Sequence, residues 1–479
     1  MSLFTLVHIA WRNFRQRILG STLTTISVAL GVGLVVSVMA IYGIITEAFE
    51  RNSSVGYSLV VGPPGSALQL TLNSVFYLSQ PIENLPYEEY MEFMTQEQRA
   101  EQLKRWGGPP EIADRTGKYA IMIDGPPLFP DPDQAQDDNV GFAIPLALGD
   151  YYGKFRLVGT TPEFFNTLKH GPLVDQPFTF AEGENFKLHD SEIGFFGAVV
   201  GARVAAEKNI GVGDIIHPNH GDPEGKGHDR GFTIVGVLDP TGTPNDRAAF
   251  VNLEGFYLLN DHSKPLPPGV EDAPAQLDSL DATLASKEGR EPLVPLTIRQ
   301  REVTSILVRP KDMGSGVLLE NRVQESLKAQ AAAPIGEINK LLQFIRPLLT
   351  VLLVITIITA VVAANGILVS IYNSMNERRR DIAIMRALGA RRDTVTAIIL
   401  IESVIIAIIG GVAGWFLAHV GIWLAGGIIE QNTGVQVSLL TISRLELWAG
   451  VLVLGLAVLA GSVPAAMAYR TDVTKNLSA

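Results

Sequence analysis

The chain has 479 residues, of which 47% are hydrophobic and 18% are charged, with a net charge of −11 and no cysteine. A mean hydropathy of +0.22 is unusual for a soluble protein and indicates a membrane protein. The region from Glu50 to Glu337 holds 41 of the 49 acidic residues, so the negative charge belongs to one segment and gives no indication of nucleic-acid binding. The absence of cysteine excludes disulfides and thiol chemistry.

The first apolar segment, residues 21–45, follows an N-terminal stretch, residues 1–20, that carries three arginines and no acidic residue. The segment is longer than the core of a secretory signal peptide, which has about 7–15 residues. It is also long enough to cross roughly 30 Å of hydrocarbon as a helix. We therefore predict a retained transmembrane helix rather than a cleaved signal.

Residues 46–346 are polar, are punctuated by Gly and Pro, and mix the periods of helices and strands, which predicts a large α/β domain outside the membrane. The expected strands include Phe155–Gly159, Phe232–Asp239 and, as the last one, Thr304–Pro310. The expected helices are Glu88–Gly107, Pro162–Leu168, Ala202–Lys208 and a pattern over Gly316–Arg346 that Pro334 interrupts. Two surface loops are expected at Asp131–Asn139 and Pro265–Pro295.

One loop of this domain, "HPNHGDPEGKGHD", contains His217, His220, His228 and Asp229. Imidazoles at such a spacing can bind zinc. The interspersed Gly and Pro residues favour a solvated, flexible hairpin instead. We therefore expect no metal site, and keep His217, His220 and His228 as the candidates if there is one.

Three further apolar segments follow, at residues 347–372, 395–428 and 447–469, and each is long enough to span a membrane. A soluble protein with buried core helices is the alternative, but four such segments exceed what one core can hold. The predicted fold is an α-helical membrane protein with four transmembrane helices and a large mixed α/β extracytoplasmic domain between helices 1 and 2.

Arginine placement predicts the orientation, because Lys and Arg are held on the cytoplasmic side of a membrane. Residues 373–394 contain six arginines, and the tail, residues 470–479, contains Arg470 and Lys475, whereas the short connection at residues 429–446 has one arginine. The N-terminal stretch, residues 373–394 and the tail are therefore predicted to be cytoplasmic. Residues 46–346 and 429–446 are predicted to lie outside.

The arginine-rich segment also has an apolar stripe, formed by Ile382, Met385 and Leu388, and Gly389 is placed to end a helix there. Such a short amphipathic helix either rests on lipid headgroups or fills a groove on a soluble partner.

Small residues recur at every fourth position within three of the apolar segments, which allows helix backbones to approach closely in lipid. They are Ala29, Gly33 and Ser37; Gly410, Gly414 and Ala418; and Ala457, Gly461 and Ala465. We expect these faces to pack helices within the chain or across a dimer.

Nucleotide hydrolysis by this chain is not expected, because the sequence has no P-loop. The nearest candidate, "GDPEGKG" at residues 221–227, has the wrong spacing and lacks the Ser or Thr that binds magnesium.

The stretch "NERRRDIAIMRALGARRDTVTAIILIESVIIAIIGGVAGWFLA" resembles the signature of FtsX/MacB-like permeases of ABC transporters. The resemblance extends along the chain, since "AWRNFRQRILGSTLTTISVALGVG" resembles the opening of that family and "VPAAMAYRTDVTKNL" its closing motif. "FRLVGTTPEFFNTL", "GAVVGARVAAE" and "FTIVGVLD" are similar to its extracytoplasmic core.

The resemblance implies that an ABC ATPase subunit docks under the loop between the second and third spans, and that its ATP-driven motion is transmitted to the outer domain. It also implies pairing with a second permease copy or a paralogue, and a periplasmic adaptor is a further candidate partner. By position, the coupling segment would be formed by Glu377, Arg378, Arg379, Arg380, Asp381, Ile382, Met385, Arg386, Leu388 and Gly389. This chain would bind no cofactor, and ATP and Mg would bind to the partner ATPase.

The expected function is therefore that of a permease subunit, itself not an enzyme, in the bacterial inner membrane with both termini cytoplasmic. It would export a substrate or extract one from the membrane or periplasm. One alternative is an FtsX-like regulator of a cell-wall hydrolase that transports nothing. A membrane-anchored metal-dependent enzyme is less favoured and would require metal at the histidine loop.

Overall fold

The chain divides into two compact units, which are described separately. The membrane unit comprises Met1–Glu47 and Leu342–Ala479, and the outer domain comprises Ala48–Leu341. The computed structural model describes residues 3–16, 18–52, 56–124, 141–170, 176–221, 223–225, 227–260, 262–266, 268, 281–377, 384, 386 and 389–433, and scattered positions between 448 and 469.

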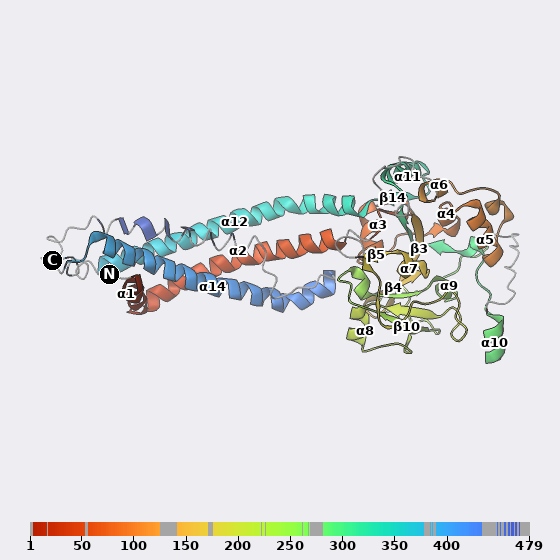
Figure 1. Ribbon diagram of the computed structural model, residues 1–479, viewed down its shortest axis with the longest axis horizontal. Helices are drawn as coiled ribbons and strands as arrows, with labels where there is room; N and C mark the ends of the chain where they lie inside the picture. Colours follow the sequence, from red (N-terminus) through yellow and green to blue (C-terminus); the bar gives the residue numbers. More distant parts are fainter. Residues whose placement is uncertain are drawn as a thin grey trace. The chain divides into compact units, whose positions relative to one another are not determined.

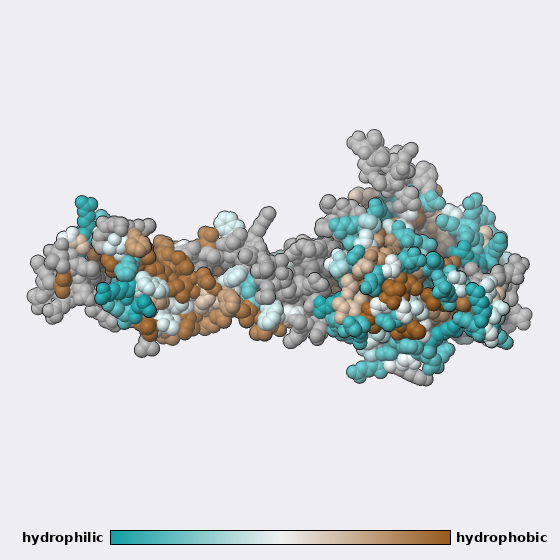
Figure 2. Space-filling model, turned by 60° about the horizontal axis from the view of Figure 1, so that its bottom comes forward, coloured by the Kyte–Doolittle hydropathy of each residue, from teal (hydrophilic) through white to brown (hydrophobic). Residues whose placement is uncertain are grey.

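Long helices form the membrane unit, and its three longest run alongside one another (Figure 1). The helices are α1 (Leu3–Gln16), α2 (Ile18–Asn52), α12 (Pro334–Glu377, which begins in the outer domain) and α14 (Arg392–Thr433). Valines and isoleucines of α2, α12 and α14, such as Val32, Ile371 and Ile399, pack into one apolar core. On the face that Figure 2 shows, the described side chains along the middle of these helices are mostly hydrophobic, as expected for contact with lipid.

Three helices are long and apolar enough to cross a membrane, with candidate spans at Gly20–Gly43, Thr350–Asn373 and Arg392–Gly426 among the described residues. They correspond to the predicted spans 21–45, 347–372 and 395–428. The fourth predicted span, residues 447–469, is described only at scattered positions and is not among the candidate spans found in the described residues, so the count of four remains a prediction.

The outer domain is built on a ten-stranded mixed sheet in the order β14-β1-β13-β3-β4-β11-β8-β10-β7, with β9 paired to β10. Its strands are β1 (Leu59–Gly62), β3 (Phe142–Tyr152), β4 (Phe155–Thr160), β7 (Phe180–Gly183), β8 (Gly197–Val200), β9 (Ile215–Ile216), β10 (Phe232–Leu238), β11 (Ala248–Asn252), β13 (Ser305–Arg309) and β14 (Gln330–Ala332). The β4–β11 and β8–β10 pairs are parallel and the others are antiparallel.

Two short pairs lie outside that sheet: β2 (Leu85–Pro86) with β12 (Glu302–Val303), and β5 (Lys169–His170) with β6 (Gln176–Pro177). The remaining helices are α3 (Ala67–Ser74), α4 (Tyr87–Met91), α5 (Gln96–Trp106), α6 (Ala120–Ile123), α7 (Glu163–Thr167), α8 (Ala202–Lys208), α9 (Leu253–Tyr257), α10 (Ala282–Glu288) and α11 (Met313–Glu325). Short 3-10 turns cover Pro110–Asp114, Pro244–Arg247 and Ile298–Gln300.

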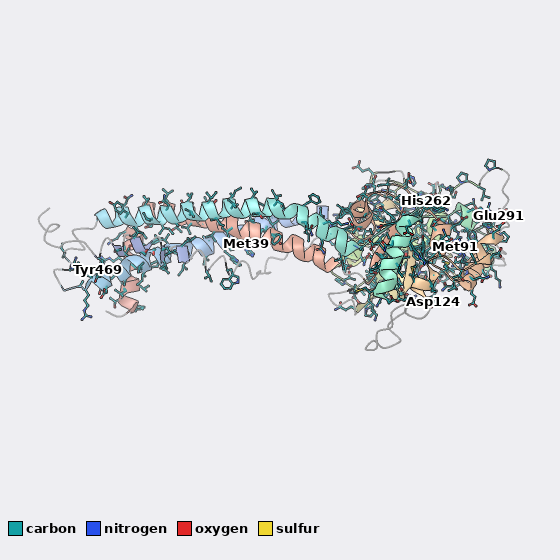
Figure 3. All side chains as sticks on the ribbon, turned by 90° about the horizontal axis from the view of Figure 1, so that it is seen from above. Met39, Met91, Asp124, His262, Glu291 and Tyr469 are labelled. Atoms are coloured by element: carbon teal, nitrogen blue, oxygen red, sulfur yellow. The ribbon has the colours of Figure 1, made fainter. Side chains whose placement is uncertain are left out.

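Large apolar side chains from both the sheet and the helices fill the core of the outer domain. Met91 of α4, labelled in Figure 3, is fully buried, and Trp106, Phe155 and Phe232 are buried with it. Strands β4, β8 and β11 are buried along their whole length, which explains why their sequences are mainly apolar and do not alternate with exposed polar residues.

The structure corrects four expectations. Helix α10 lies within the predicted surface loop Pro265–Pro295 and buries Leu284 and Ala285. The predicted helix Glu88–Gly107 is two helices, because Thr95 starts α5 with a capping box to Gln98. Pro334 begins α12 rather than interrupting a helix, since the first turn needs no N–H from it. The strand at Thr304–Pro310 is not the last, because β14 follows and pairs with β1.

Candidate functional site

The predicted coupling segment lies largely outside the described residues. Glu377 is the last residue of α12. Gly389 has a φ of 102°, which favours glycine, and its N–H donates to the carbonyl of Arg386 at 3.1 Å, in the turn that precedes α14. Outside the described residues lie Arg378, Arg379, Arg380, Asp381, Ile382, Met385 and Leu388, so the apolar stripe stays a prediction.

The structure brings several of the predicted small residues together between α2 and α14. A Cβ on Gly33 would lie 3.2 Å from the carbonyl oxygen of Gly414, and one on Gly414 would lie 2.3 Å from that of Ala29. A Cβ on Gly410 would lie 2.8 Å from Val28. The backbones of these two helices therefore approach as closely as glycine allows.

The other predicted packing positions differ in how closely they are packed and in how deeply they are buried. A Cβ on Gly461 would lie 2.4 Å from Oγ of Ser403, and Ala418 and Ala465 are buried. Ser37 is half-buried, and Ala457 lies outside the described residues.

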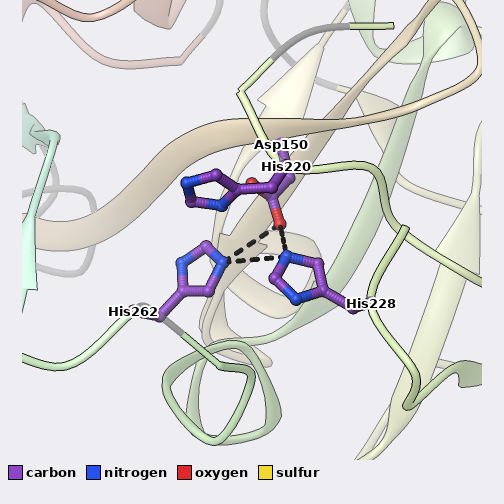
Figure 4. Close-up of side chains that lie close together, drawn as sticks. All are labelled: Asp150, His220, His228 and His262. Atoms are coloured by element: carbon purple, nitrogen blue, oxygen red, sulfur yellow. Dashed lines mark hydrogen bonds and ion pairs between the residues drawn. The ribbon is translucent and has the colours of Figure 1, made fainter. Parts of the chain in front are cut away.

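A second feature, in the outer domain, is a cluster of Asp150, His220, His228 and His262, which we call the histidine–aspartate cluster (Figure 4). One potential ligand atom from each residue lies within 4.8 Å of all the others. Oδ2 of Asp150 is 3.0 Å from Nε2 of His228 and 3.1 Å from Nε2 of His262, and these two nitrogens are 3.3 Å apart. Nδ1 of His220 is 3.4 Å from Oδ1 of Asp150.

Three separate parts of the chain supply these side chains. Asp150 is on β3, where the pairing with β4 shifts register between Leu148 and Tyr151, and such a bulge re-aims a side chain. His220 and His228 are on the hairpin between β9 and β10. His262 follows α9 and packs against the ring of Phe256, with centroids 4.3 Å apart.

Backbone bonds hold the hairpin against β3. The N–H of Tyr151 donates to the carbonyl of Asn219 at 3.0 Å, and the N–H of Asn219 donates back at 2.7 Å. Within the hairpin, the N–H of His228 donates to the carbonyl of Pro218 at 2.9 Å. These bonds place His220 and His228 beside Asp150 without relying on any side-chain contact.

The cluster is buried on one side and open on the other. The side chain of Asp150 is 0% exposed, those of His228 and His262 are 6% and 8% exposed, and that of His220 is 49% exposed. Burial lowers the pKa of His228 below its usual value, although Asp150 opposes the shift. The His228 imidazole is therefore neutral at neutral pH, with a lone pair free on one ring nitrogen.

A cleft of about 510 Å³ adjoins the cluster. Asp150, His220 and His262 line it together with Glu302 and Lys264, among other residues. The open side of the cluster therefore faces a space that can admit water or a small ligand.

Two of the three histidines of the sequence motif join the cluster, and the third does not. His217 points elsewhere, with Nδ1 3.4 Å from the carbonyl oxygen of His228, and Asp229 is not in the cluster. The expectation of a solvated hairpin is wrong for His228, whose side chain is buried. Sequence reasoning missed Asp150 and His262, because neither is near the motif in the chain and no local pattern marks them.

Comparison with known families matches two parts of the chain. Residues 21–325 match the MacB-like periplasmic core domain, and residues 353–473 match the FtsX-like permease C-terminal region. The first match alone covers more than half of the chain.

Individual relatives are more distant. The chain is 35% identical over 123 residues to a macrolide export ATP-binding/permease protein MacB of Paracoccus denitrificans, which covers 26% of this chain and 18% of that protein. It is 27% identical over 282 residues to an uncharacterized ABC transporter permease of Methanocaldococcus jannaschii, covering 57% of this chain and 58% of that one. A probable syringafactin export ATP-binding/permease protein of Pseudomonas syringae is 30% identical over 192 residues, covering 37% of this chain and 27% of that protein.

The chain thus spans less than two thirds of the length of each of these relatives. The two matched regions nevertheless follow each other along the chain. The first covers most of the outer domain, and the second covers most of the part of the membrane unit that begins at Leu342. The chain therefore belongs to the family of membrane-embedded ABC transporter permeases that join a MacB-like periplasmic core domain to an FtsX-like permease region.

Proposed function

We propose that this chain is the permease subunit of an ABC transporter and that a separate ATPase subunit drives it. The observation that carries the proposal is the pair of family matches, at residues 21–325 and 353–473. Two relatives are named as combined ATP-binding/permease proteins, whereas this sequence has no P-loop of its own. ATP and Mg would accordingly bind to the partner.

The proposed site of coupling is the segment from Glu377 to Gly389 between the second and third spans. Its arginines favour the cytoplasmic side of an inner membrane for this segment, and both termini would lie on the same side. Ile382, Met385 and Leu388 would fill a groove on the ATPase, and the arginines around them would contact its acidic residues or the lipid headgroups. A second permease copy or paralogue would complete the transporter, and an adaptor could join it outside.

The secondary structure supports a mechanical route from that segment to the outer domain. Helix α12 has 44 residues, which is roughly 66 Å and about twice the thickness of the hydrocarbon core. It begins two residues after β14 ends, and β14 pairs with β1, the first strand after α2. A displacement of α2 against α12 would therefore act on the β1–β14 pairing at the edge of the sheet.

We further propose that this motion serves export, or extraction of a substrate from the membrane or periplasm. The macrolide and syringafactin relatives are named for export, which supports that direction. The proposed coupling to the ATPase does not depend on which substrate is moved.

Replacing Met385 with Asp tests the coupling segment. If Met385 fills an apolar groove on the ATPase, the new carboxylate becomes buried there at a cost of several kcal/mol. A loss of about 3 kcal/mol weakens association more than a hundredfold. We expect the ATPase to stop co-purifying with Met385→Asp but to co-purify with Met385→Leu, the matched control that keeps the apolar volume.

Both variants should reach the membrane at normal abundance, because the change lies outside the predicted spans. If Met385 rested on lipid instead, Met385→Asp would leave the ATPase bound. Unchanged recovery of the ATPase with Met385→Asp would contradict the assigned coupling role.

A further inference from the structure

The histidine–aspartate cluster has the geometry of one face of a metal coordination sphere. Oδ2 of Asp150 and the Nε2 atoms of His228 and His262 form a triangle with sides of 3.0, 3.1 and 3.3 Å. In a tetrahedral zinc site the ligand atoms lie about 2.0–2.1 Å from the metal, so neighbouring ligand atoms are about 3.3 Å apart. A zinc ion therefore fits against this triangle with little movement of the side chains.

His220 stands where a fourth ligand is needed. Its Nδ1 is 3.4 Å from Oδ1 of Asp150, and its ring lies 5.6 Å from that of His228 and 5.3 Å from that of His262, centroid to centroid. Because its side chain is half exposed, His220 can rotate toward the triangle without disturbing the core. Figure 4 shows the three rings gathered around the carboxylate.

Hydrogen bonds within the protein do not satisfy all the polar atoms of the cluster. Oδ1 of Asp150 is fully buried and makes no hydrogen bond, and its contact with Nδ1 of His220 is long, at 3.4 Å; a buried carboxylate oxygen without a hydrogen bond is unfavourable. The Nε2 atoms of His228 and His262 face both each other and the same carboxylate oxygen. A cation between them would accept lone pairs from both nitrogens and balance the carboxylate charge at once.

We propose that Asp150, His220, His228 and His262 bind one divalent transition-metal ion, and that Zn²⁺ is the ion that fits them best. Three imidazoles and one carboxylate suit zinc, whereas Mg²⁺ and Ca²⁺ prefer oxygen ligands throughout. Every proposed ligand lies in the outer domain and outside the predicted coupling segment. The metal site therefore goes beyond the permease function and does not depend on it.

The site is built for an ion that can enter and leave. Three ligands are buried and held by β3, by the bonded hairpin and by the packing of His262 on Phe256, so they are preorganised. The fourth, His220, lines the cleft together with Asp150 and His262. Movement of this one exposed side chain opens the coordination sphere to the cleft, which sites closed on all sides do not allow.

Zinc binding to the full-length chain in detergent tests the proposal, after removal of any polyhistidine tag. Protein equilibrated with Zn²⁺ and then freed of excess metal should retain one zinc per chain by elemental analysis. Competition with a chromophoric chelator should give an affinity at least about tenfold weaker for His220→Ala. An excess of Mg²⁺ or Ca²⁺ should not displace the zinc.

His217→Ala is the matched control, because it removes a histidine of the same hairpin that is not a proposed ligand. It should bind zinc as the unaltered chain does. His228→Gln tests a buried ligand and should abolish retention, with circular dichroism and gel filtration confirming that it folds. If His228→Gln does not fold, His220→Ala alone decides, since its exposed side chain is dispensable for folding.

Three results would overturn the proposal. The first is an unaltered chain that retains no zinc, and the second is a His220→Ala chain with unchanged affinity. The third is a His217→Ala chain that loses zinc as readily as His220→Ala, which would show nonspecific binding by hairpin histidines.

Discussion

The outer domain and the membrane unit differ in how they satisfy buried polar side chains and in how their elements pack together. In the outer domain, Arg301 is 0% exposed and is held by Glu254 through two bonds of 2.7 and 2.9 Å. In the membrane unit, buried hydroxyls such as that of Thr24 donate to a carbonyl one turn back in their own helix. Its helices α2 and α14 approach each other closely at Gly33 and Gly414.

The difference follows from the solvent that each unit faces. Folding in water can bring charged side chains from distant segments into one buried network. Here the Cζ atom of Arg301 also lies 4.4 Å from the centroid of the Trp106 ring. Lipid supplies no hydrophobic drive between helices, so contact area gained by small residues has to hold them together. One unit should therefore be sensitive to a lost charge, and the other to an added methyl group.

The largest effect is expected from Arg301→Met in the outer domain. The variant leaves Glu254 buried without its partner, and burial already raises the pKa of this carboxyl even with Arg301 beside it. Removing one member of a buried ion pair costs about 3–5 kcal/mol. Hydrogen exchange in full-length protein should show faster opening of the outer domain, with unchanged exchange in the membrane helices.

The double variant Arg301→Met/Glu254→Gln serves as its control. Because the unpaired charge is then gone, a large part of the lost stability should return. A double variant that is as unstable as the sum of the two single variants would show that the pair is not coupled.

The membrane unit should respond to Gly414→Ala. The added Cβ would lie 2.3 Å from the carbonyl oxygen of Ala29 and 2.9 Å from the nitrogen of Gly33, so two backbones have to separate. Overpacking of this kind costs about 1–3 kcal/mol. We expect a lower thermal midpoint in detergent, with hydrogen exchange accelerated in α2 and α14 but not in the outer domain.

Gly411→Ala is the matched control on the same helix, because nothing lies within 4 Å of a Cβ there. Replacing this helical glycine should leave stability unchanged or raise it by up to about 1 kcal/mol. If the two alanine variants behaved alike, the close contact of α2 with α14 would have no role in stability.

A smaller, pH-dependent effect is expected at Glu92 in the outer domain. Burial tends to raise the pKa of its carboxyl. Bonds from Arg115 at 2.8 Å and from the N–H of Lys118 at 2.9 Å, with the charge of Arg99 nearby, outweigh burial and lower the pKa below the usual 4.5. Since the folded-state pKa is the lower one, the stabilisation is complete above about pH 4.5 and is lost as pH falls below it.

Glu92→Gln should remove this dependence. The difference is expected to be about 1 kcal/mol or less, because the Arg115 side chain is 49% exposed and its charge is screened. Thermal midpoints measured between pH 3 and pH 7 should converge for the two proteins at the acidic end. Parallel curves over the whole range would mean that Glu92 does not titrate differently on folding.

Local patterns made much of this fold predictable. Helix α8 begins and ends where Ala202–Lys208 was predicted, since Gly201 precedes it and Asn209 ends it in a left-handed conformation. Strand β10 was visible because an apolar run is bounded by polar residues. The three long apolar helices followed from length and hydropathy alone.

Features that depend on contacts between distant parts of the chain could not be predicted from the sequence. Strand β14 has three residues and forms only because β1 lies beside it. The histidine–aspartate cluster joins Asp150 to His262 across 112 positions of the chain, with a bulge aiming the carboxylate. The sequence spacing selected His217, which lies outside the cluster. It also omitted Asp150 and His262, which belong to it.

The central claim, that this permease is driven by a separate ATPase subunit, is tested most directly by ATP hydrolysis in reconstituted membranes. The purified chain alone should hydrolyse no ATP, because it lacks a P-loop. Activity should appear when the co-purifying ATPase is added, and should disappear when the P-loop lysine of that partner is replaced. Robust turnover by the isolated chain, or turnover that survives the partner's lysine substitution, would contradict the account.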